Sequence, residues 1–198
     1  ERSESLMSDT HARDNITSAE LALDKEGRFL AFRVITAANL GAYLGTMTPH
    51  SPTNNLGGLA GVYTTPAIYT AVSGRFTNTG WTGPYRGAGR PEASLAIEKA
   101  IDRAANELGI DRAEIRRRNL IPADAMPYQT GLIFNYDSGD FPAVLEQSLE
   151  LAHYDDFETR RAEAASRGKL RGMGIAYAIE QAAAPIEELA EIRFDGQG

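Results

Sequence analysis

The residues best suited to chemistry form the short run Arg-Gly-Ala-Gly-Arg at positions 86–90, directly before a predicted helix. Small residues let a ligand approach the backbone, and the N–H groups in the first turn of a helix attract oxyanions. The two flanking arginines can hold an anion through charge-assisted hydrogen bonds. The run is therefore typical of an anion-binding loop, or of a tight turn whose arginines pair with acids such as Glu92.

Other catalytic patterns fail on residue type or spacing. A dinucleotide-binding fingerprint would need a third glycine where Glu92 stands and a buried strand where Pro84 lies. The three histidines are far apart and the chain has no cysteine, so we expect no protein-held metal, disulfide or thiol nucleophile. A G-x-S-x-G elbow is also missing from the sequence. The sequence therefore assigns no catalytic side chain and no metal ligand.

Two further features have both a structural and a functional interpretation. Trp81 lies among turn residues, where its ring could stack on a ligand. We favour the alternative, in which Trp81 is buried and anchors the loop. The arginines at positions 112 and 116–118 form a locally basic cluster. The acids around this cluster favour a solvated surface or an interface.

Hydrophobic periodicity predicts the elements that must position the loop. Alternating apolar residues around a turn at Gly27 predict a hairpin of strands at 17–23 and 29–35, and a third strand is predicted at 67–76. A helix begins at Pro91 and ends at Gly109, with an apolar stripe of Ile97, Ile101, Ala104 and Leu108. The glycine-rich run thus lies between a strand and the start of a long helix.

The rest of the chain predicts more helices and then a return to strands. Helices are expected at 111–119, 140–152 and 157–166, and strands at 170–182 and 186–194, whereas residues 1–14 are expected to be a loop or a frayed strand. This order indicates an α+β fold, a mixed sheet with hairpins and packed helices, spanning parts of two domains. The prolines in the irregular segment 122–140 favour a domain boundary there, between residues 1–121 and 141–198.

Composition excludes several classes of protein. The 198 residues carry 20 Lys+Arg against 27 Asp+Glu, and 42% of them are hydrophobic, so the chain can bury a core. The net charge of −7 argues against nucleic acid as a partner. We also predict no membrane partner, because no apolar run approaches the ~20 residues of a spanning helix.

Three motifs occur in order along the chain, namely GPYRGAGRPEA at 83–93, ELG at 107–109 with IRRRNLI at 115–121, and YDSGDF at 136–141. Together they resemble the large subunit of the molybdenum hydroxylases. This is the xanthine dehydrogenase family, and the similarity is greatest to its aerobic carbon monoxide dehydrogenase branch. Residues 2–14 and 38–43 are similar to the family's preceding segments. The resemblance covers a minority of a full subunit. The chain also starts at Glu1 and ends at a hairpin turn without its second strand, so we expect it to be a piece of a longer chain.

The resemblance implies a molybdopterin, in its cytosine dinucleotide form, whose molybdenum the protein does not ligate. It implies hydroxylation of a small organic substrate with water-derived oxygen, electron transfer to iron–sulfur and FAD partners, and a cytoplasmic location. The cofactor-binding residues would be Tyr85, Arg86, Gly87, Ala88, Gly89 and Arg90, and Ala88 and Glu180 would face the substrate. For Glu180, the role of an ordinary strand carboxylate is the alternative. The family's catalytic glutamate would lie beyond Gly198, so we expect this stretch alone to be inactive and cofactor-free.

The departures from the family narrow the substrate. Carbon monoxide dehydrogenases place a copper-holding cysteine where this chain has Gly87, so no copper is expected. Purine-oxidising members have phenylalanine near Ala88 and arginine near Asn54, which speaks against xanthine. A non-catalytic assembly module of such a complex is the alternative function. An unrelated nucleotide-binding domain is a third, supported by the glycine loop alone.

Overall fold

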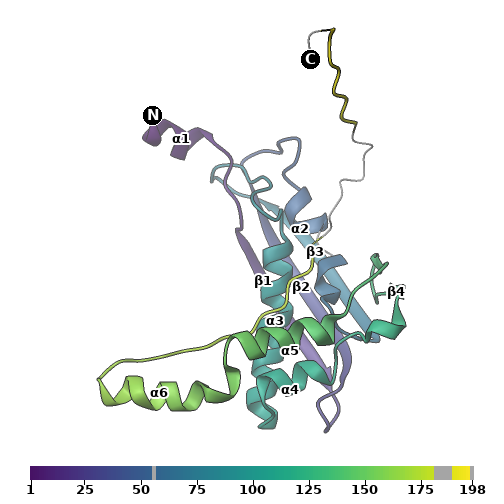
Figure 1. The fold of residues 1–198 in the computed structure, drawn as a ribbon. Helices are drawn as coiled ribbons and strands as arrows, with labels where there is room; N and C mark the ends of the chain where they lie inside the picture. Colours follow the sequence, from purple (N-terminus) through teal and green to yellow (C-terminus); the bar gives the residue numbers. More distant parts are fainter. Residues whose placement is uncertain (55–56, 181–188, 197–198) are drawn as a thin grey trace.

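The structure is a computed structural model that describes residues 1–54, 57–180 and 189–196. It contains a three-stranded mixed sheet (Figure 1). β1 (Asn15–Leu23) and β2 (Phe29–Gly41) make the predicted antiparallel hairpin, and β3 (Ala67–Phe76) pairs with β2 in parallel. The strands lie in the order β1-β2-β3, so β2 is central. The predicted mixed sheet of an α+β fold is therefore confirmed.

The long helix α3 (Arg90–Leu108) covers one face of this sheet. Gly89 and Gly109, both in the left-handed region, bound the helix, and a proline stands in its first turn. Ile97 and Ile101 of the predicted stripe are buried, but Leu108 is 42% exposed because the last turn extends past the core. In the part of the chain that is described, no helix is both long enough and apolar enough to cross a bilayer.

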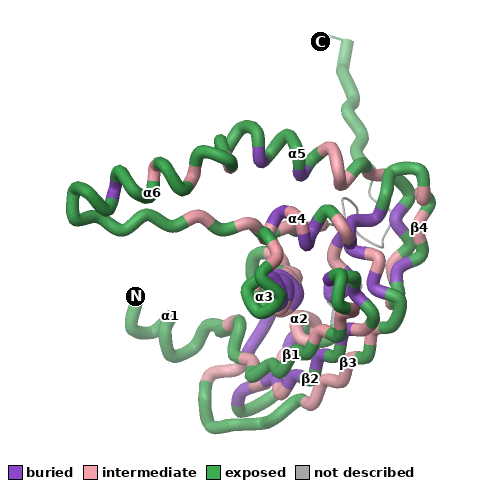
Figure 2. Tube along the Cα trace, turned by 90° about the horizontal axis from the view of Figure 1, so that it is seen from below, coloured by how far each residue is buried: buried purple, intermediate pink, exposed green. Residues whose placement is uncertain are grey.

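Three layers are visible when the molecule is viewed along α3 (Figure 2). The sheet lies on one side of α3, while α4 (Arg112–Arg117) and α5 (Phe141–Leu151) lie on the other. One buried apolar cluster joins all three layers, with members such as Phe32 from β2, Ile101 from α3 and Leu145 from α5. The outer face of the sheet carries exposed apolar residues, among them Ile16, Ile35 and Tyr69.

The connection from β2 to β3 crosses back over the sheet so that the two strands run parallel. It contains α2 (His50–Asn54) and the short 3₁₀ helix η1 (Gly57–Ala60), which contacts α3. Val62 and Tyr63 follow η1 and are almost completely buried. This segment, which has no clear periodicity in sequence, thus contributes to the core.

Residues 122–140, the predicted domain boundary, hold a 3₁₀ turn, η2 (Ala123–Ala125), and a small hairpin of β4 (Tyr128–Gln129) and β5 (Asn135–Tyr136). The Tyr136 hydroxyl donates to the Gly61 carbonyl at 2.7 Å, which fastens the hairpin to the body. A further 3₁₀ turn, η3 (Tyr154–Asp156), then leads into α6 (Phe157–Ser166), which extends away from the body (Figure 1). The division of the chain at 122–140 stays a prediction.

Two expectations about local structure are wrong. The opening residues contain a short helix, α1 (Arg2–Ser8), in which Glu4 completes a capping box, instead of a loop or frayed strand. Residues 170–180 and 189–196 belong to no strand; the rest of the two strands predicted there lies outside the described residues. Residues 171–180 are extended with alternating burial because Ile175, Tyr177 and Ile179 pack on the core, and no strand pairs with them in the described structure.

Candidate functional site: the loop before α3

The loop before α3 has an uncommon backbone conformation. Residues 86–89 all have positive φ, with values of 31° at Arg86, 90° at Gly87, 45° at Ala88 and 95° at Gly89. A left-handed conformation is costly for residues with a Cβ, so Arg86 and Ala88 are strained. Two turn bonds hold this geometry, from the Ala88 amide to the Tyr85 carbonyl at 3.2 Å and from the Arg90 amide to the Gly87 carbonyl at 2.9 Å. Such strain is concentrated at ligand-binding and active sites.

Gly87 has no room for a side chain. A Cβ at this position would lie 2.8 Å from Cδ and 2.9 Å from Cγ of Pro91, the proline in the first turn of α3. Since φ there is also +90°, any other residue would both strain the backbone and force the ring to move. The loop therefore requires a glycine at position 87, where the backbone packs against the first turn of α3.

The N-terminal segment runs beside the loop and supplies a side chain that the sequence did not single out. The His11 amide donates to the Trp81 carbonyl at 2.9 Å, and the Gly83 amide donates to the His11 carbonyl at 2.8 Å. These bonds form a parallel bridge between residues 11 and 82, two residues before Arg13 and three before Tyr85. The pairing places Arg13 next to the loop.

Arg13 contacts the loop at several points. Its Nη2 donates to the Tyr85 carbonyl at 3.0 Å and also to the Arg86 carbonyl, and its guanidinium lies 5.3 Å from the centre of the Tyr85 ring. Its Nε lies 3.8 Å from Oε2 of Glu92 in the first turn of α3. No local pattern could have predicted this, because 72 residues separate Arg13 from Tyr85.

Two residues predicted separately from the sequence meet on another side of the loop. Nε of Arg90 lies 2.9 Å from Oε1 of Glu180, at the end of the extended segment. Both line a groove of about 530 Å³ together with Tyr136 and Phe141. Ala88 is not among the described residues that line this groove. The structure thus joins Glu180 to the loop before α3 through Arg90, and the role of Glu180 toward a substrate stays a prediction.

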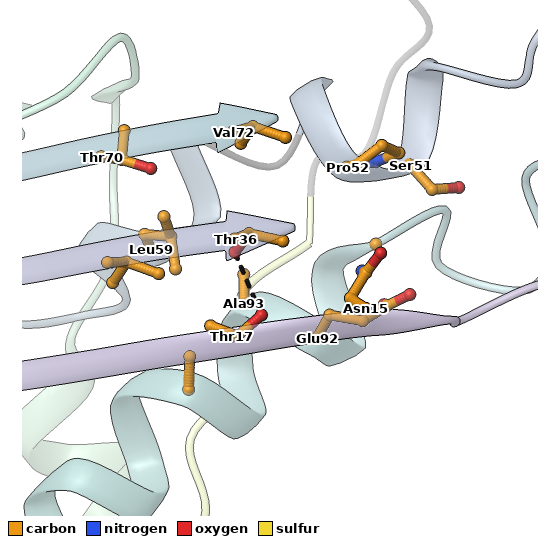
Figure 3. A pocket seen from close by; sticks show the side chains of 13 residues that line it. Asn15, Thr17, Thr36, Ser51, Pro52, Leu59, Thr70, Val72, Glu92 and Ala93 are labelled. Atoms are coloured by element: carbon orange, nitrogen blue, oxygen red, sulfur yellow. Dashed lines mark hydrogen bonds between the residues drawn. The ribbon is translucent and has the colours of Figure 1, made fainter. Parts of the chain in front are cut away.

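A much smaller cavity lies between the start of α3 and the inner face of the sheet (Figure 3). Its walls include Thr70, Gly89, Glu92 and the hydrogen-bonded pair Thr17 and Thr36, whose hydroxyl oxygens are 3.0 Å apart. The volume is about 40 Å³, which exceeds the ~10–15 Å³ that one water needs but is far below that of a cofactor. A ligand of the loop must therefore bind outside this cavity.

The tryptophan and the arginine cluster differ in how well they were predicted. Trp81 is half-buried, stacks on Tyr43 at a centroid distance of 5.8 Å and fills the space over Gly45, which agrees with the role of a loop anchor. Arg116, expected on a solvated or interface surface, has a fully buried side chain. That part of the cluster prediction is wrong.

Burial of Arg116 is balanced by acids on α3. Its Nη2 lies 2.7 Å from Oε2 of Glu98 and 3.0 Å from Oδ1 of Asp102, and Glu98 also accepts from the Tyr63 hydroxyl at 2.6 Å. Burial and the adjacent Glu98 charge raise the pKa of Tyr63 well above its usual range. Burial is the largest single effect and lowers the pKa of Arg116, but its partners, Glu98 first among them, together outweigh burial and raise that pKa. Because these groups satisfy one another away from solvent, we assign them to the core.

The site therefore consists of a strained loop with bare backbone at the start of a helix, with arginines on both sides. Among the described residues, no three His, Cys, Asp or Glu side chains form a group that could hold a metal. Bare backbone at a helix start and flanking arginines are features that suit the binding of an anion. Residues 1–120 match the family described as the molybdopterin cofactor-binding domain, and the chain belongs to this family.

Relatives extend the match along the whole chain. The chain is 31% identical to the 6-hydroxypseudooxynicotine dehydrogenase complex subunit gamma of Paenarthrobacter nicotinovorans over 203 residues, which cover 100% of the chain and 26% of that protein. It is 33% identical to the carbon monoxide dehydrogenase large chain of Afipia carboxidovorans, over 91% of the chain and 23% of that protein. The chain spans about a quarter of the length of these relatives.

Solved structures show the same similarity. The quinoline 2-oxidoreductase of Pseudomonas putida 86 matches with a TM-score of 0.78 and 32% identity, over 85% of the chain and 22% of that protein. A Cu,Mo-CO dehydrogenase matches with a TM-score of 0.77 and 31% identity, over 85% of the chain and 22% of that protein. The resemblance to large subunits of molybdenum hydroxylases, expected from the sequence, is thereby confirmed.

Proposed function

We propose that this chain is the part of a molybdenum hydroxylase large subunit that binds the anionic molybdopterin through the loop of residues 85–90. The observation that carries the proposal is the run of positive φ values over residues 86–89 at the start of α3. Strain of this kind persists only where the surroundings enforce it, and a ligand-binding role explains why it is kept. The family match over residues 1–120 supports molybdopterin as the ligand.

The residues of the loop fit an anionic ligand in three ways. Gly87 carries no side chain that could cover the neighbouring amides, and its contact with Pro91 requires a glycine there. Backbone N–H groups at the start of α3 favour negative charge. Arg86, which is exposed, and Arg90, which pairs with Glu180, supply positive charge on either side of the glycines.

The bound cofactor would supply the redox chemistry, in which a water-derived oxygen is inserted into the substrate. The chain's own residues would bind and orient it: the loop amides would hold oxyanions, and Tyr85, Ala88 and Gly89 would shape the surface next to them. The electrons would pass to iron–sulfur and FAD partners. We further propose the cytosine dinucleotide form, no copper, and a cytoplasmic location.

We infer a small organic substrate with an electron-poor carbon. A copper-holding thiolate is excluded at position 87 by residue type, and the space there would not accept one without movement of Pro91. Several relatives bear names of nitrogen heterocycles, namely nicotine 6-hydroxylase large subunit and quinoline 2-oxidoreductase. Azaheterocycles are therefore the first substrates to screen, followed by aldehydes and carbon monoxide.

The proposal is tested by exchanging Arg86 for alanine in the complete enzyme with its partner subunits. We expect molybdenum content per subunit and turnover both to fall, by about 10- to 100-fold if the arginine contributes as a strong charge-assisted contact of 1.5–3 kcal/mol. Inductively coupled plasma mass spectrometry measures the metal, and a steady-state assay measures turnover.

Arg103→Ala is the matched control for this experiment. Arg103 lies on α3, the helix that follows the loop, and its side chain is 81% exposed and pairs only with Glu107 one turn away among the described residues. This variant should keep both molybdenum and turnover. If Arg86→Ala also retains full molybdenum and full turnover, the assigned role of the loop is rejected.

An assembly role is the second candidate, and the outer face of the sheet favours it. Ile16 is 81% exposed, Tyr69 is 60% exposed and Ile35 lies in the central strand between them, at 46%. Ile35→Asp should weaken co-purification of the chain's subunit with its partners while leaving the loop intact. Unchanged co-purification and unchanged molybdenum content would remove this candidate.

A further inference from the structure

We infer that Arg13 is a positioning residue for the loop: it sets the direction in which the amides of Arg86 and Gly87 point. This inference rests on the proposed function, since it concerns how the same loop is prepared for its anionic ligand. Arg13 lies outside the glycine-rich motif and on a different segment of the chain. It reaches the loop only because residues 11 and 82 form a backbone bridge.

The geometry of two consecutive peptide groups carries the argument. Nη2 of Arg13 binds the carbonyl oxygens of Tyr85 and Arg86, so both carbonyls point toward the guanidinium. In a trans peptide the N–H points opposite to the C=O. The amides of Arg86 and Gly87, which share these two peptides, must therefore point away from Arg13.

This orientation separates donors from acceptors at the loop. Two carbonyl dipoles would repel an anion if they faced it, and Arg13 holds both of them on the side away from the amides. With the carbonyls so held, the amides of two consecutive residues are both directed away from Arg13, where they can donate to one anion. Arg13 thus acts on the ligand through the backbone of residues 85–87.

Arg13 is itself held in place from two directions. Its guanidinium lies over the Tyr85 ring, and its Nε approaches Oε2 of Glu92, an oxygen that is buried and has no hydrogen bond within the described structure. Arg13 also has a left-handed backbone, with φ at 59°. Arg13 is thus strained as well as the loop that it contacts. This indicates that the fold enforces the contact between them and not only the conformation of the loop.

The test uses the complete enzyme with its partner subunits and compares Arg13→Gln with Arg13→Lys. We expect Arg13→Gln to lower molybdenum content and kcat by about 10- to 100-fold, as loss of a group that orients a ligand commonly does. Lysine keeps the charge beside Glu92 and can donate to a carbonyl, but it lacks the planar guanidinium that lies over the Tyr85 ring, so it should restore only part of the loss.

A second readout separates positioning from general support of the fold. Hydrogen exchange of the peptide covering residues 84–92 should accelerate in Arg13→Gln, while exchange in α4 and α5 stays unchanged. Arg103→Gln is the control, because Arg103 is exposed on α3 and pairs with Glu107 one turn away, and it should behave as the unmodified enzyme.

The outcomes distinguish this inference from the proposed function. If Arg86→Ala loses molybdenum but Arg13→Gln keeps full molybdenum and normal exchange at 84–92, the positioning role is overturned and the loop assignment stands. If neither variant changes molybdenum content or turnover, both are overturned. A loss in Arg13→Gln with partial recovery in Arg13→Lys supports both.

Discussion

Arg13 and Arg116 make the same kind of contact in two regions of the molecule. Each donates from its guanidinium to two backbone carbonyls: Arg13 to Tyr85 and Arg86, and Arg116 to Arg112 and Ile175. Each also faces a glutamate of α3, Glu92 or Glu98. In each case a segment distant in sequence is fastened to the helix layer.

The two regions differ in solvent access and in the quality of the ion pair. The Arg116 side chain is fully buried and lies 2.7 Å from Glu98, whereas Arg13 is 34% exposed and lies 3.8 Å from Glu92. The carbonyls held by Arg13 belong to a strained loop, and Ile175, held by Arg116, belongs to an extended segment packed on the core. The same kind of contact therefore stabilises the fold in the interior and, by our inference, orients the proposed ligand-binding loop near the surface.

The largest effect is expected at the buried arginine. Arg116→Met leaves the buried Glu98 without its cation, and removing one partner of a buried pair costs about 3–5 kcal/mol. Native-state hydrogen exchange of α3 and α4, in the complete protein, measures the loss. Arg117→Met is the control, because Arg117 is 41% exposed and its pair with Glu146 contributes about 0–1 kcal/mol. Equal losses in the two variants would remove the distinction between the regions.

A second test concerns the bare backbone of the loop. Gly87→Ala combines a positive φ with contact at 2.8 Å to Pro91, whereas Gly109→Ala at the other end of α3 has a positive φ and open space. Gly109→Ala should cost about 1 kcal/mol from backbone strain alone. Gly87→Ala should cost more and should also lower molybdenum content. Retention of molybdenum in Gly87→Ala would show that the loop tolerates movement and is not pre-formed.

The pH dependence of stability tests the contribution of Asp111, the residue that caps α4. Asp111 caps α4 by accepting from the Ala113 and Glu114 amides, and it also accepts from Tyr154. Burial raises the pKa of Asp111, but these hydrogen bonds outweigh it, so the pKa lies below the ordinary value of 3.8. A lowered carboxyl pKa contributes stability above the ordinary value, which is lost as pH falls through the folded-state pKa.

Asp111→Asn removes this titration while keeping a residue suited to capping. Thermal unfolding midpoints measured from pH 7 to pH 3 should fall less steeply below about pH 4 in the variant than in the unmodified protein. If the unfolding midpoints of the two proteins fall equally steeply below about pH 4, Asp111 does not contribute to the acid sensitivity of α4.

The smallest effect on stability is expected at Arg13. Because this residue is partly exposed and 3.8 Å from its glutamate, Arg13→Gln should lower the stability of α3 by less than about 1 kcal/mol. Hydrogen exchange of α3 outside its first turn provides the measurement. A loss as large as that of Arg116→Met would mean that both arginines are structural.

The sequence predicted the loop and the regular elements around it because these depend on local chemistry. Glycines and a proline mark the start of α3, and period-2 alternation marks the hairpin of β1 and β2. It could not predict contacts made between segments far apart. Arg13 belongs to the site through a backbone bridge, and nothing near it in sequence indicates the partner.

The sequence could not predict which charged residues are buried. Arg116, Arg117 and Arg118 are adjacent and of one type, yet only the first has a fully buried side chain, because it faces α3 and its acids. The alternation at 171–180 predicted a strand, but its inward side chains pack on the helix layer instead. In both cases the tertiary neighbours decide the outcome.

The central claim, that the loop before α3 holds the cofactor through backbone amides turned away from Arg13, is tested most directly by a cryo-EM structure of the complete enzyme with cofactor bound. We predict that the amide nitrogens of Arg86 and Gly87 lie about 2.7–3.2 Å from oxyanion or pterin acceptors. The Tyr85 and Arg86 carbonyls should still be bound to Arg13. A cofactor located elsewhere, or a loop whose carbonyls face it, would contradict the account.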